Sequence, residues 1–528
     1  MTVDDLKDSG TRWRALRRPR RVVATAFLFI LAAAAALLAA DWDAAVTRAS
    51  FAQARTHLTE LRAFLQHMPK GADLHAHLSG AAYAERYIEW AAADGLCWRK
   101  TALTIVRTCD AAQGDIAVAE AAKDQATYDD IVNAFSMRAF LPTPDEPTAH
   151  DHFFATFGRF SAATYTRFAD MLADQLDAYA AQSVQYAELM ATFLTSDERR
   201  KIAAAIKAGP DYDALIAALN SGDKERSDAA LGTMLRGAEK GGLASVVGDM
   251  QARFAAGLKD IAATLACDSP RPRPGCRVSW NLIAQISRNT PIEEVFAQTA
   301  AAAALIRKQP RLVAFNFVQP EDYAIARRDY RAHMRIVGFL ARPPSGDEPV
   351  NVALHAGELW IGLVPPDDLT FHIGDAVEVA GAKRIGHGVD LAFENNRDRL
   401  LENMRRKQIA VEINLTSNDQ ILGVRGREHP FQAYRAAGVP VVLSTDDAGV
   451  ERIDLTHEYA RAARDYGLSY AAMKELARAS LAHSFARGDK DALLKQLGEK
   501  SDSFEKSIAG KKSFFENLWL IAKFIWRP

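Results

Sequence analysis

The chain has 528 residues, 49% of them hydrophobic, and its 65 basic residues nearly balance its 66 acidic residues. This length and apolar content allow a large core, either in one large barrel with insertions or in two or three smaller domains. The balanced charge argues against a nucleic-acid-binding surface, although the stretch RWRALRRPRR at 12–21 is strongly basic.

The basic stretch is followed at 22–40 by nineteen uncharged, mostly apolar residues, VVATAFLFILAAAAALLAA. A helix of about 20 apolar residues crosses a bilayer, and a basic region before apolar and small residues also describes a secretory signal. We therefore expect 1–42 to be a signal peptide or a membrane anchor. The basic side should stay in the cytosol, so the rest of the chain should be periplasmic or extracellular, either released or anchored through 22–40.

Residues 43–68 are predicted to be a helical segment, because they are rich in alanine and place an apolar residue every three to four positions. The stretch MPKGADLHAHL at 68–78 then breaks the helix and starts a strand. His75 and His77 are two residues apart, so their side chains share one face of that strand. A shared face suits two ligands of one metal ion, and two hydrogen-bonded core histidines are the alternative.

The four cysteines are consistent with an exported protein, because disulfides form in oxidising compartments. Cys97 and Cys109 bracket CWRKTALTIVRTC, which alternates like a short hairpin, and Cys267 and Cys276 bracket a proline-rich loop. Two local disulfides are the natural pairing among the three possible ones, and four free thiols are the alternative. Each bridge would close a loop of roughly ten residues and stabilise the fold by about 2–3 kcal/mol.

Eight strand-like segments ending in polar residues run through the chain, most of them separated by helix-patterned stretches. This alternation predicts parallel pairing, and eight such units predict a closed (β/α)8 TIM barrel, an α/β fold, over 69–500. The segments lie at 68–78, 183–191, 276–288, 311–321, 350–358, 384–391, 409–418 and 439–447.

Two connections, at 79–182 and 192–275, are too long for simple crossovers. We expect these insertions to cover the barrel mouth or to mediate association, for example into a homodimer. The C-terminal segment at 501–528 is aromatic and amphipathic. It is expected to pack against the barrel or a partner subunit, and contact with a membrane surface is the alternative.

Ionisable side chains gather at the ends of four predicted strands. In a barrel these ends converge on one mouth, where chemistry is expected. Nitrogen and oxygen ligands from three histidines and one aspartate suit a single catalytic zinc ion with an open position for water, whose pKa zinc lowers to near 7. The residues are His75 and His77, then His355 and Glu358, then His387, and finally Asp446 and Asp447.

Each group has an expected role at such a mouth. His75, His77, His355 and Asp446 are the candidate zinc ligands. His387 is placed either to accept a proton from the water or to hold the attacking hydroxide, and Glu358 could give a proton to a ring nitrogen of the substrate. Asp447 is expected to bond the substrate rather than the metal.

The motifs PKGADLHAHLSGA, HAGE, RIGHGVDL, INLTSN and LSTDD occur in the order found in the adenosine deaminase family of the metallo-dependent hydrolase superfamily, which the chain resembles. ASLAHSFA at 479–486 is similar to that family's closing helix. MPKGADLH and the long early insertion look most like the exported, growth-factor-type members. The resemblance implies one zinc ion per subunit and hydrolysis of adenosine, and by extension 2′-deoxyadenosine, to inosine and ammonia.

The resemblance also implies roles for single residues. His75, His77, His355 and Asp446 would bind zinc. Glu358 would protonate N1 of the purine, His387 would assist the attack on C6, and Asp447 would bond N7.

Three departures from the family pattern fall on the expected substrate pocket. Ser79 stands where an acidic residue usually meets a ribose hydroxyl, and Gln319 stands near a glycine whose backbone faces the purine. Ala448 replaces the proline usual after the paired aspartates. Ser79 and Gln319 are therefore candidate substrate-binding positions, and the reaction type is better specified than the sugar preference.

Other functions remain open at this point. They are deamination of another aminopurine, zinc-dependent hydrolysis of a different C–N bond, and growth-factor-like binding by a retained fold without turnover. The last alternative expects a lost ligand or a lost Glu358, and neither is lost. A cytidine-deaminase type of zinc site is excluded, because its HxE and PCxxC signature is absent from the sequence.

Overall fold

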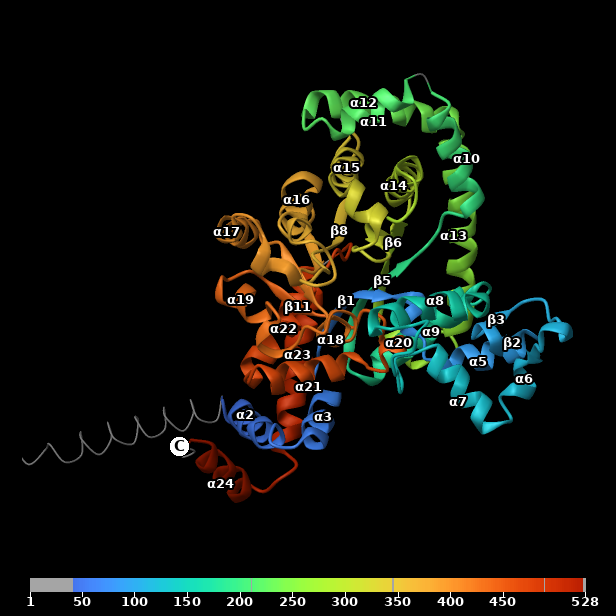
Figure 1. The fold of residues 1–528 in the computed structure, drawn as a ribbon. Helices are drawn as coiled ribbons and strands as arrows, with labels where there is room; N and C mark the ends of the chain where they lie inside the picture. Colours follow the sequence, from blue (N-terminus) through green and yellow to red (C-terminus); the bar gives the residue numbers. More distant parts are fainter. Residues whose placement is uncertain (1–40, 210, 344–345, 489, 526–528) are drawn as a thin grey trace, which may run out of the picture. The chain divides into compact units, whose positions relative to one another are not determined.

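The computed structural model describes residues 41–209, 211–343, 346–488 and 490–525 (Figure 1). Contacts divide the chain into two units, Met1–Ser50 with Asp502–Pro528, and Phe51–Ser501. The predicted signal or anchor at 22–40 lies outside the described residues. None of the helices in the described ranges is both long and apolar enough to span a bilayer.

Eight parallel strands form the centre of the larger unit, in the order of the chain. The amide of Asp446 donates to the carbonyl of His75 (2.8 Å), and the amide of His77 donates to the carbonyl of Asp446 (3.0 Å), so the segment after the last strand returns to the first. The predicted (β/α)8 barrel is confirmed as a nearly closed one. Its strands are β1 (Gly71–His77), β5 (Val184–Ala191), β6 (Ser279–Ser287), β7 (Leu312–Val318), β8 (Asn351–Ala356), β9 (Arg384–His387), β10 (Ala410–Ile413) and β11 (Val441–Leu443).

Helices follow most of the strands and bury their apolar stripes against the sheet. The exception to the predicted pattern is 368–382, which is not one helix. It is divided into a 3-10 turn, a single helical turn (α16, His372–Asp375) and a π turn that ends at Gly381 (φ 71°), where a left-handed backbone terminates helices. The remaining barrel helices are α14 (Ile292–Ile306), α15 (Ala324–Ala341), α17 (Arg397–Lys407), α18 (Leu415–Leu422), α19 (Phe431–Ala436), α20 (Ala448–Glu451), α21 (Leu455–Asp465) and α22 (Tyr470–Ala482).

The first long connection contains a small antiparallel sheet and six helices. Its strands β2 (Cys97–Arg99), β3 (Thr104–Val106) and β4 (Ile116–Ala117) lie beside the disulfide that joins Cys97 to Cys109. Helix α8 (Ala149–Thr164) begins at the N-cap Thr148, whose side chain accepts from the amide of Asp151. The other helices are α4 (Leu78–Ala81), α5 (Ala84–Ala93), α6 (Val118–Ala121), α7 (Gln125–Ala134) and α9 (Phe168–Ala181).

The second long connection is helical. Its first helix starts with a capping box in which Thr195 and Glu198 bind each other's backbone amides. After its last helix, a disulfide joins Cys267 to Cys276. The helices are α10 (Ser196–Lys207), α11 (Tyr212–Asn220), α12 (Lys224–Lys240) and α13 (Leu243–Leu265).

The predicted helical segment at 43–68 is two helices, α2 (Trp42–Ala54) and α3 (Leu58–His67). At the other end, α23 (Lys490–Ala509) precedes α24 (Phe514–Ile525). Within the smaller unit, the ring of Trp42 stacks on Phe514 with centroids 5.0 Å apart. Several large apolar side chains of α24 are exposed, Phe515 and Trp519 among them.

Candidate metal centre and active site

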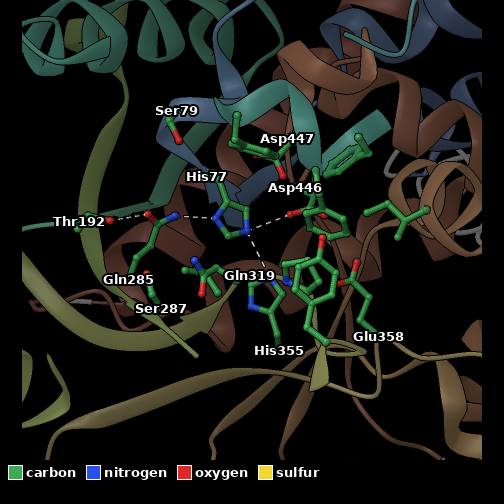
Figure 2. Close-up of a pocket in the computed structure, with 17 residues that line it drawn as sticks. His77, Ser79, Thr192, Gln285, Ser287, Gln319, His355, Glu358, Asp446 and Asp447 are labelled. Atoms are coloured by element: carbon green, nitrogen blue, oxygen red, sulfur yellow. Dashed lines mark hydrogen bonds and ion pairs between the residues drawn. The ribbon is translucent and has the colours of Figure 1, made fainter. Parts of the chain in front are cut away.

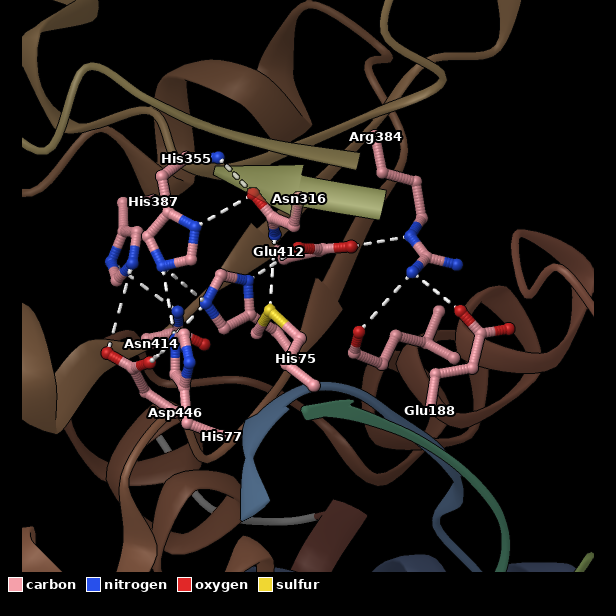
Figure 3. Close-up of polar contacts among 12 residues, drawn as sticks. His75, His77, Glu188, Asn316, His355, Arg384, His387, Glu412, Asn414 and Asp446 are labelled. Atoms are coloured by element: carbon pink, nitrogen blue, oxygen red, sulfur yellow. Dashed lines mark hydrogen bonds and ion pairs between the residues drawn. The ribbon is translucent and has the colours of Figure 1, made fainter. Parts of the chain in front are cut away.

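Four ligand atoms converge at the carboxyl ends of β1, β8 and β11 (Figure 3). The Nε2 atom of His355 lies 3.1 Å from that of His75 and 3.2 Å from that of His77. Oδ1 of Asp446 lies 3.4 Å and 3.2 Å from the same two nitrogens. Zinc bonds of 2.0–2.1 Å in a tetrahedron place ligand atoms roughly 3.3 Å apart, so this set fits one zinc-sized ion.

Hydrogen bonds behind the rings turn the bare nitrogens toward this centre. Nδ1 of His75 donates to Oε2 of Glu412 (2.6 Å), and Nδ1 of His355 donates to Oδ1 of Asn316 (2.9 Å). A neutral imidazole has one N–H, so each Nε2 keeps its lone pair for a metal. Three ring nitrogens and a carboxylate oxygen this close together suit a metal ion as the occupant.

The third ring is held by an amide on β6. Gln285 places its side-chain amide 2.7 Å from Nδ1 of His77, and Thr192 donates to the Gln285 oxygen at 3.1 Å. Amide oxygen and nitrogen are assigned from the surrounding network. A neutral His77 that presents its Nε2 lone pair to a metal needs an acceptor at Nδ1. The Gln285 oxygen supplies it when the amide is turned over, and the amide nitrogen then donates to the hydroxyl of Thr192.

A network of buried charged side chains supports the four ligand atoms from behind the ring of His75. Arg384 contacts Glu412 at 2.5 Å and Glu188 at 2.6 Å, and all three side chains are buried. Burial lowers the pKa of His75, but the adjacent carboxylates of Asp446 and Glu412 outweigh it and raise that pKa to about 10. These carboxylates make the centre attractive to a positive charge, which a divalent cation supplies.

Asp446 is held in a backbone conformation that non-glycine residues seldom adopt. Its φ is 59°, and its Oδ2 accepts a hydrogen bond from Ser417 Oγ at 2.7 Å. The preceding Thr445 donates to the buried carboxylate of Asp73 at 2.7 Å, which fixes the loop against β1. Such strain persists only where surrounding contacts enforce it, and it concentrates at functional sites.

Glu358 and His387 stand beside the four ligand atoms. Burial, together with the nearby charges of Asp446 and Glu321, raises the pKa of Glu358 well above its usual range, so its carboxyl can carry a proton at neutral pH. Burial lowers the pKa of His387 to about 3, which leaves the imidazole neutral. Nδ1 of His387 lies 3.5 Å from Oε1 of Glu358, and its Nε2 lies 3.8 Å from Oδ2 of Asp446.

A buried carboxylate that sequence reasoning missed holds the backbone of Glu358. Glu321 accepts from the amide of Gly357 at 3.1 Å and from the amide of Glu358 at 3.0 Å. It also contacts Nδ1 of His372 (2.5 Å), and Nη1 of Arg288 lies 3.5 Å away. Arg288 and His372, with the two amides, outweigh burial and lower the pKa of Glu321 to about 2, so it is a fixed anion.

Replacing this anion should misplace the proton donor. Glu321→Ala is expected to lower kcat by about 10²-fold, the typical result of a small displacement of a reacting group. The metal ligands do not contact Glu321, so zinc content measured by elemental analysis should stay the same. Glu394→Gln is the matched control, because this buried carboxylate accepts from Gly374 and not from the Glu358 backbone. An equal loss in the control would contradict a specific role.

A cavity of about 390 Å³ opens onto the same centre (Figure 2). One wall is apolar, with Phe153, Phe154 and Phe157 from α8, so the first insertion reaches the barrel mouth. Much of the remaining lining is polar, and none of the described lining residues is a lysine or an arginine. The labelled members are His77, Ser79, Thr192, Gln285, Ser287, Gln319, His355, Glu358, Asp446 and Asp447.

The two predicted substrate-binding positions, Ser79 and Gln319, both line this cavity. Gln319 has a φ of 80°, a backbone region that glycine occupies without strain, and its side chain accepts from the amide of Asn289 at 2.9 Å. The side chain is therefore tied to the loop after β6. The carbonyl of Ser79 accepts from the hydroxyl of Tyr87.

The side chain of Asp447 has room only because residue 80 is a glycine. A Cβ at Gly80 would lie 1.6 Å from Oδ1 of Asp447, so only glycine leaves room for this carboxylate. The amide of Asp447 donates to Glu451 at 3.0 Å. Burial and then the charge of Asp446 raise the pKa of Asp447 well above its usual range, which makes a protonated, hydrogen-bond-donating form accessible.

Comparisons with known proteins point in one direction. The sequence model of the family described as "Adenosine deaminase" matches residues 244–500. Adenosine deaminase of Enterococcus faecalis (strain ATCC 700802 / V583) is 36% identical over 148 residues, which are 28% of this chain and 40% of that protein. Adenosine deaminase of Aliivibrio fischeri (strain ATCC 700601 / ES114) is 34% identical over 161 residues, 29% of this chain and 43% of that protein. The chain thus spans about two fifths of the length of these relatives.

Solved structures share the fold. A crystal structure of Arabidopsis ADAL complexed with GMP has a TM-score of 0.51 at 19% identity and covers 84% of this chain and 98% of its own. An ADAL–IMP complex has a TM-score of 0.51 at 20% identity, with coverage of 84% and 99%. At these identities the likeness supports the barrel architecture.

Proposed function

We propose that this chain, whose residues 244–500 match the sequence model of the adenosine deaminase family, is a zinc-dependent hydrolase that deaminates adenosine and 2′-deoxyadenosine. Water replaces the 6-amino group, so adenosine and water give inosine and ammonia. The observation that carries the proposal is the convergence of three Nε2 atoms and Asp446 Oδ1 beside a protonatable Glu358 in one cavity.

His75, His77, His355 and Asp446 are the residues that would hold the zinc ion. When bound, zinc supplies a Lewis acid that brings the pKa of a water ligand down to about 7. Glu358, whose pKa is raised by its buried setting, gives a proton to N1 of the purine, which makes C6 electrophilic. Asp447 in its protonated form donates to N7.

The residues that line the cavity favour a neutral sugar over a phosphate beside the purine. The polar wall of Ser79, Thr192, Gln285 and Ser287 offers hydroxyl and amide groups that suit ribose hydroxyls. The charged lining groups, Glu358, Asp446 and Asp447, are all acidic in type. A phosphate would meet no lysine or arginine among the described lining residues.

Adenosine should therefore be preferred to AMP by at least about 100-fold in kcat/KM, because a phosphate taken out of water without a cation to pair with it costs several kcal/mol. The absorbance change on conversion to the 6-oxopurine measures both rates on zinc-loaded protein. Neutral 5′-deoxyadenosine is the control, since it also lacks the 5′-hydroxyl but carries no charge. Efficient AMP turnover would remove the nucleoside assignment and leave a nucleotide deaminase.

The same assay separates the alternatives. Turnover of a different aminopurine alone would redirect the substrate, and hydrolysis of a non-purine C–N bond would favour a broader amidohydrolase. Binding of adenosine without turnover by zinc-loaded protein would favour a growth-factor-like binding protein. We also propose export to the periplasm or the cell exterior, and the Cys97–Cys109 and Cys267–Cys276 bridges support an oxidising compartment.

A further inference from the structure

His387 can serve the proposed reaction in two opposite ways. With a bare Nε2 it could take a proton from the attacking water, and with an Nε2–H it could only donate a hydrogen bond to that oxygen. We infer that a relay of hydrogen bonds through Asn418 and His429 fixes the second form, so that His387 is a donor and these two residues are its positioning residues. The inference rests on the proposed deaminase function and assigns a role within it.

The relay starts at a group that can only donate. The backbone amide of Phe431, the first residue of α19, donates to Nδ1 of His429 at 3.1 Å. His429 is buried, and burial lowers its pKa to about 3, so the ring is neutral and carries a single N–H. Because Nδ1 accepts, that N–H is on Nε2.

The side-chain amide of Asn418 carries this hydrogen-bond direction from His429 to His387. Nε2 of His429 lies 2.9 Å from the side-chain oxygen of Asn418 and donates to it. This contact determines which way the Asn418 amide faces, because its oxygen is needed at His429. Its nitrogen therefore faces Nδ1 of His387, at 2.9 Å. The orientation follows from the Phe431 amide and not from the assignment of amide atoms.

These contacts determine which ring nitrogen of His387 carries the proton. An amide nitrogen can only donate, so Nδ1 of His387 accepts from Asn418, and the side-chain nitrogen of Asn414 approaches the same atom at 3.4 Å. A neutral His387 must then carry its proton on Nε2. That atom is buried, has no hydrogen-bond partner among the described residues, and lies 3.8 Å from Oδ2 of Asp446. It is the kind of orphaned donor that a bound oxygen would satisfy.

The opposite tautomer would be costly. An N–H on Nδ1 would point at the Asn418 and Asn414 amides, and turning Asn418 over would place its N–H groups against the Nε2–H of His429. The one other acceptor near Nδ1 among the described residues is Oε1 of Glu358, at 3.5 Å. A buried donor left unsatisfied costs about 1–3 kcal/mol.

The charged and titratable groups around His387 come from several strands, and none of them reverses the relay. Three are carboxyl groups, of which Glu358 lies 3.5 Å from Nδ1 and Asp446 lies 3.8 Å from Nε2, and two are rings whose Nδ1 atoms are held by other side chains. These groups are Glu321 after β7, Glu358 after β8, Asp446 after β11, and His75 and His77 on β1.

An N–H at Nε2 of His387 can stabilise the attacking oxygen. The attacking oxygen gains negative charge shared with C6 as the bond forms, and an N–H already aimed at it needs no reorganisation. His387 also has a φ of 67°, so its backbone is held in a region that packing must enforce. The relay fixes the ring in the donor form before substrate arrives.

Asn418→Asp tests the inference, because it keeps the side-chain shape and replaces the donating amide by a carboxylate. The carboxylate accepts from Nδ1 of His387 and leaves Nε2 bare. The expected result is a fall in kcat of about 10²–10³-fold, the usual loss on removing one preorganised donor. KM for adenosine and zinc content should change little. If His387 were a base, the same variant would match or exceed the wild-type rate, and that outcome would overturn the inference.

The tautomer can also be read directly in the wild-type protein. Nitrogen–proton correlation spectra of zinc-loaded protein carrying ¹⁵N-histidine should show the His387 proton on Nε2, with its signals identified by their loss in His387→Gln. A proton on Nδ1 would sink the inference even if Asn418→Asp failed to fold. This spectrum does not need turnover, so a protein that deaminates no purine would refute the proposed function and still report the tautomer.

His429 supplies the matched pair of variants. His429→Gln keeps an N–H that can donate to the Asn418 oxygen, and His429→Leu does not. The first should retain most of the wild-type kcat, and the second should lose rate and show a mixed His387 tautomer. Equal rates in the two variants, with an unchanged tautomer, would show that the relay does not set the ring.

Discussion

Glu358→Gln is expected to lower kcat by about 10²–10⁴-fold, the range that proton transfer by a positioned side chain contributes. Glutamine has nearly the same shape and keeps the backbone amide that Glu321 binds, but it has no acidic proton to give to N1. Zinc content and the unfolding temperature should remain near the wild-type values. Steady-state kinetics on adenosine, with elemental analysis of the same sample, measures both.

The control for this variant is Glu293→Gln. Glu293 is also buried and accepts from the hydroxyl of Tyr212 at 2.6 Å, but it lies on α14 outside the cavity. It should keep full activity. A Glu358→Gln protein that deaminates adenosine at the wild-type rate would remove this carboxyl from the chemistry, and the proton at N1 would then need another source.

The second large effect is expected from His355→Ala, which should lose metal and activity together. His355 Nε2 lies 3.1 Å from Nε2 of His75 and 3.2 Å from Nε2 of His77, so its loss removes one of the four converging ligand atoms. Loss of a residue that only hydrogen-bonds to a metal ligand typically lowers metal affinity or activity by about 10–100-fold, so loss of a ligand itself should lower them further. Zinc retained after dialysis against a mild chelator, and kcat after zinc is restored, are the two measurements.

His333→Leu distinguishes this loss from general damage. His333 is a buried histidine on α15 that packs edge-on against Phe317, and its Nε2 has no hydrogen-bond partner among the described residues. Leucine keeps the burial, so the control should retain zinc. If His355→Ala held zinc as tightly as the wild-type protein, the proposed ligand set would be wrong.

The strand pattern predicted the barrel because each strand can be recognised from its own residues. Runs such as NLIAQIS and LVAFNF are apolar on both faces, as buried parallel strands must be, and polar residues mark their ends. The break within 43–68 and the divided segment at 368–382 were not predicted. Helix periodicity continues through such places, while turns at their boundaries depend on contacts with distant parts of the chain.

The candidate ligands could be named because each lies at the end of a strand, and a barrel brings these ends together. The residues that orient them could not be named in the same way. Glu412 orients His75 across 337 positions of sequence, and Asn316 orients His355 from the neighbouring strand. Glu412 did leave one signal, a carboxylate inside an otherwise apolar strand, since a buried charge needs a partner.

The sequence alone therefore determined the succession of strands and helices and the residue types that converge at the barrel mouth, because these follow from local periodicity and from one rule about strand ends. Only the tertiary structure decided which ring nitrogen faces the centre, which way the Asn418 amide points, and which carboxylate holds the Glu358 backbone. Hydrogen-bond direction depends on distances of about 3 Å between residues far apart in the chain, and no pattern along the chain encodes such distances.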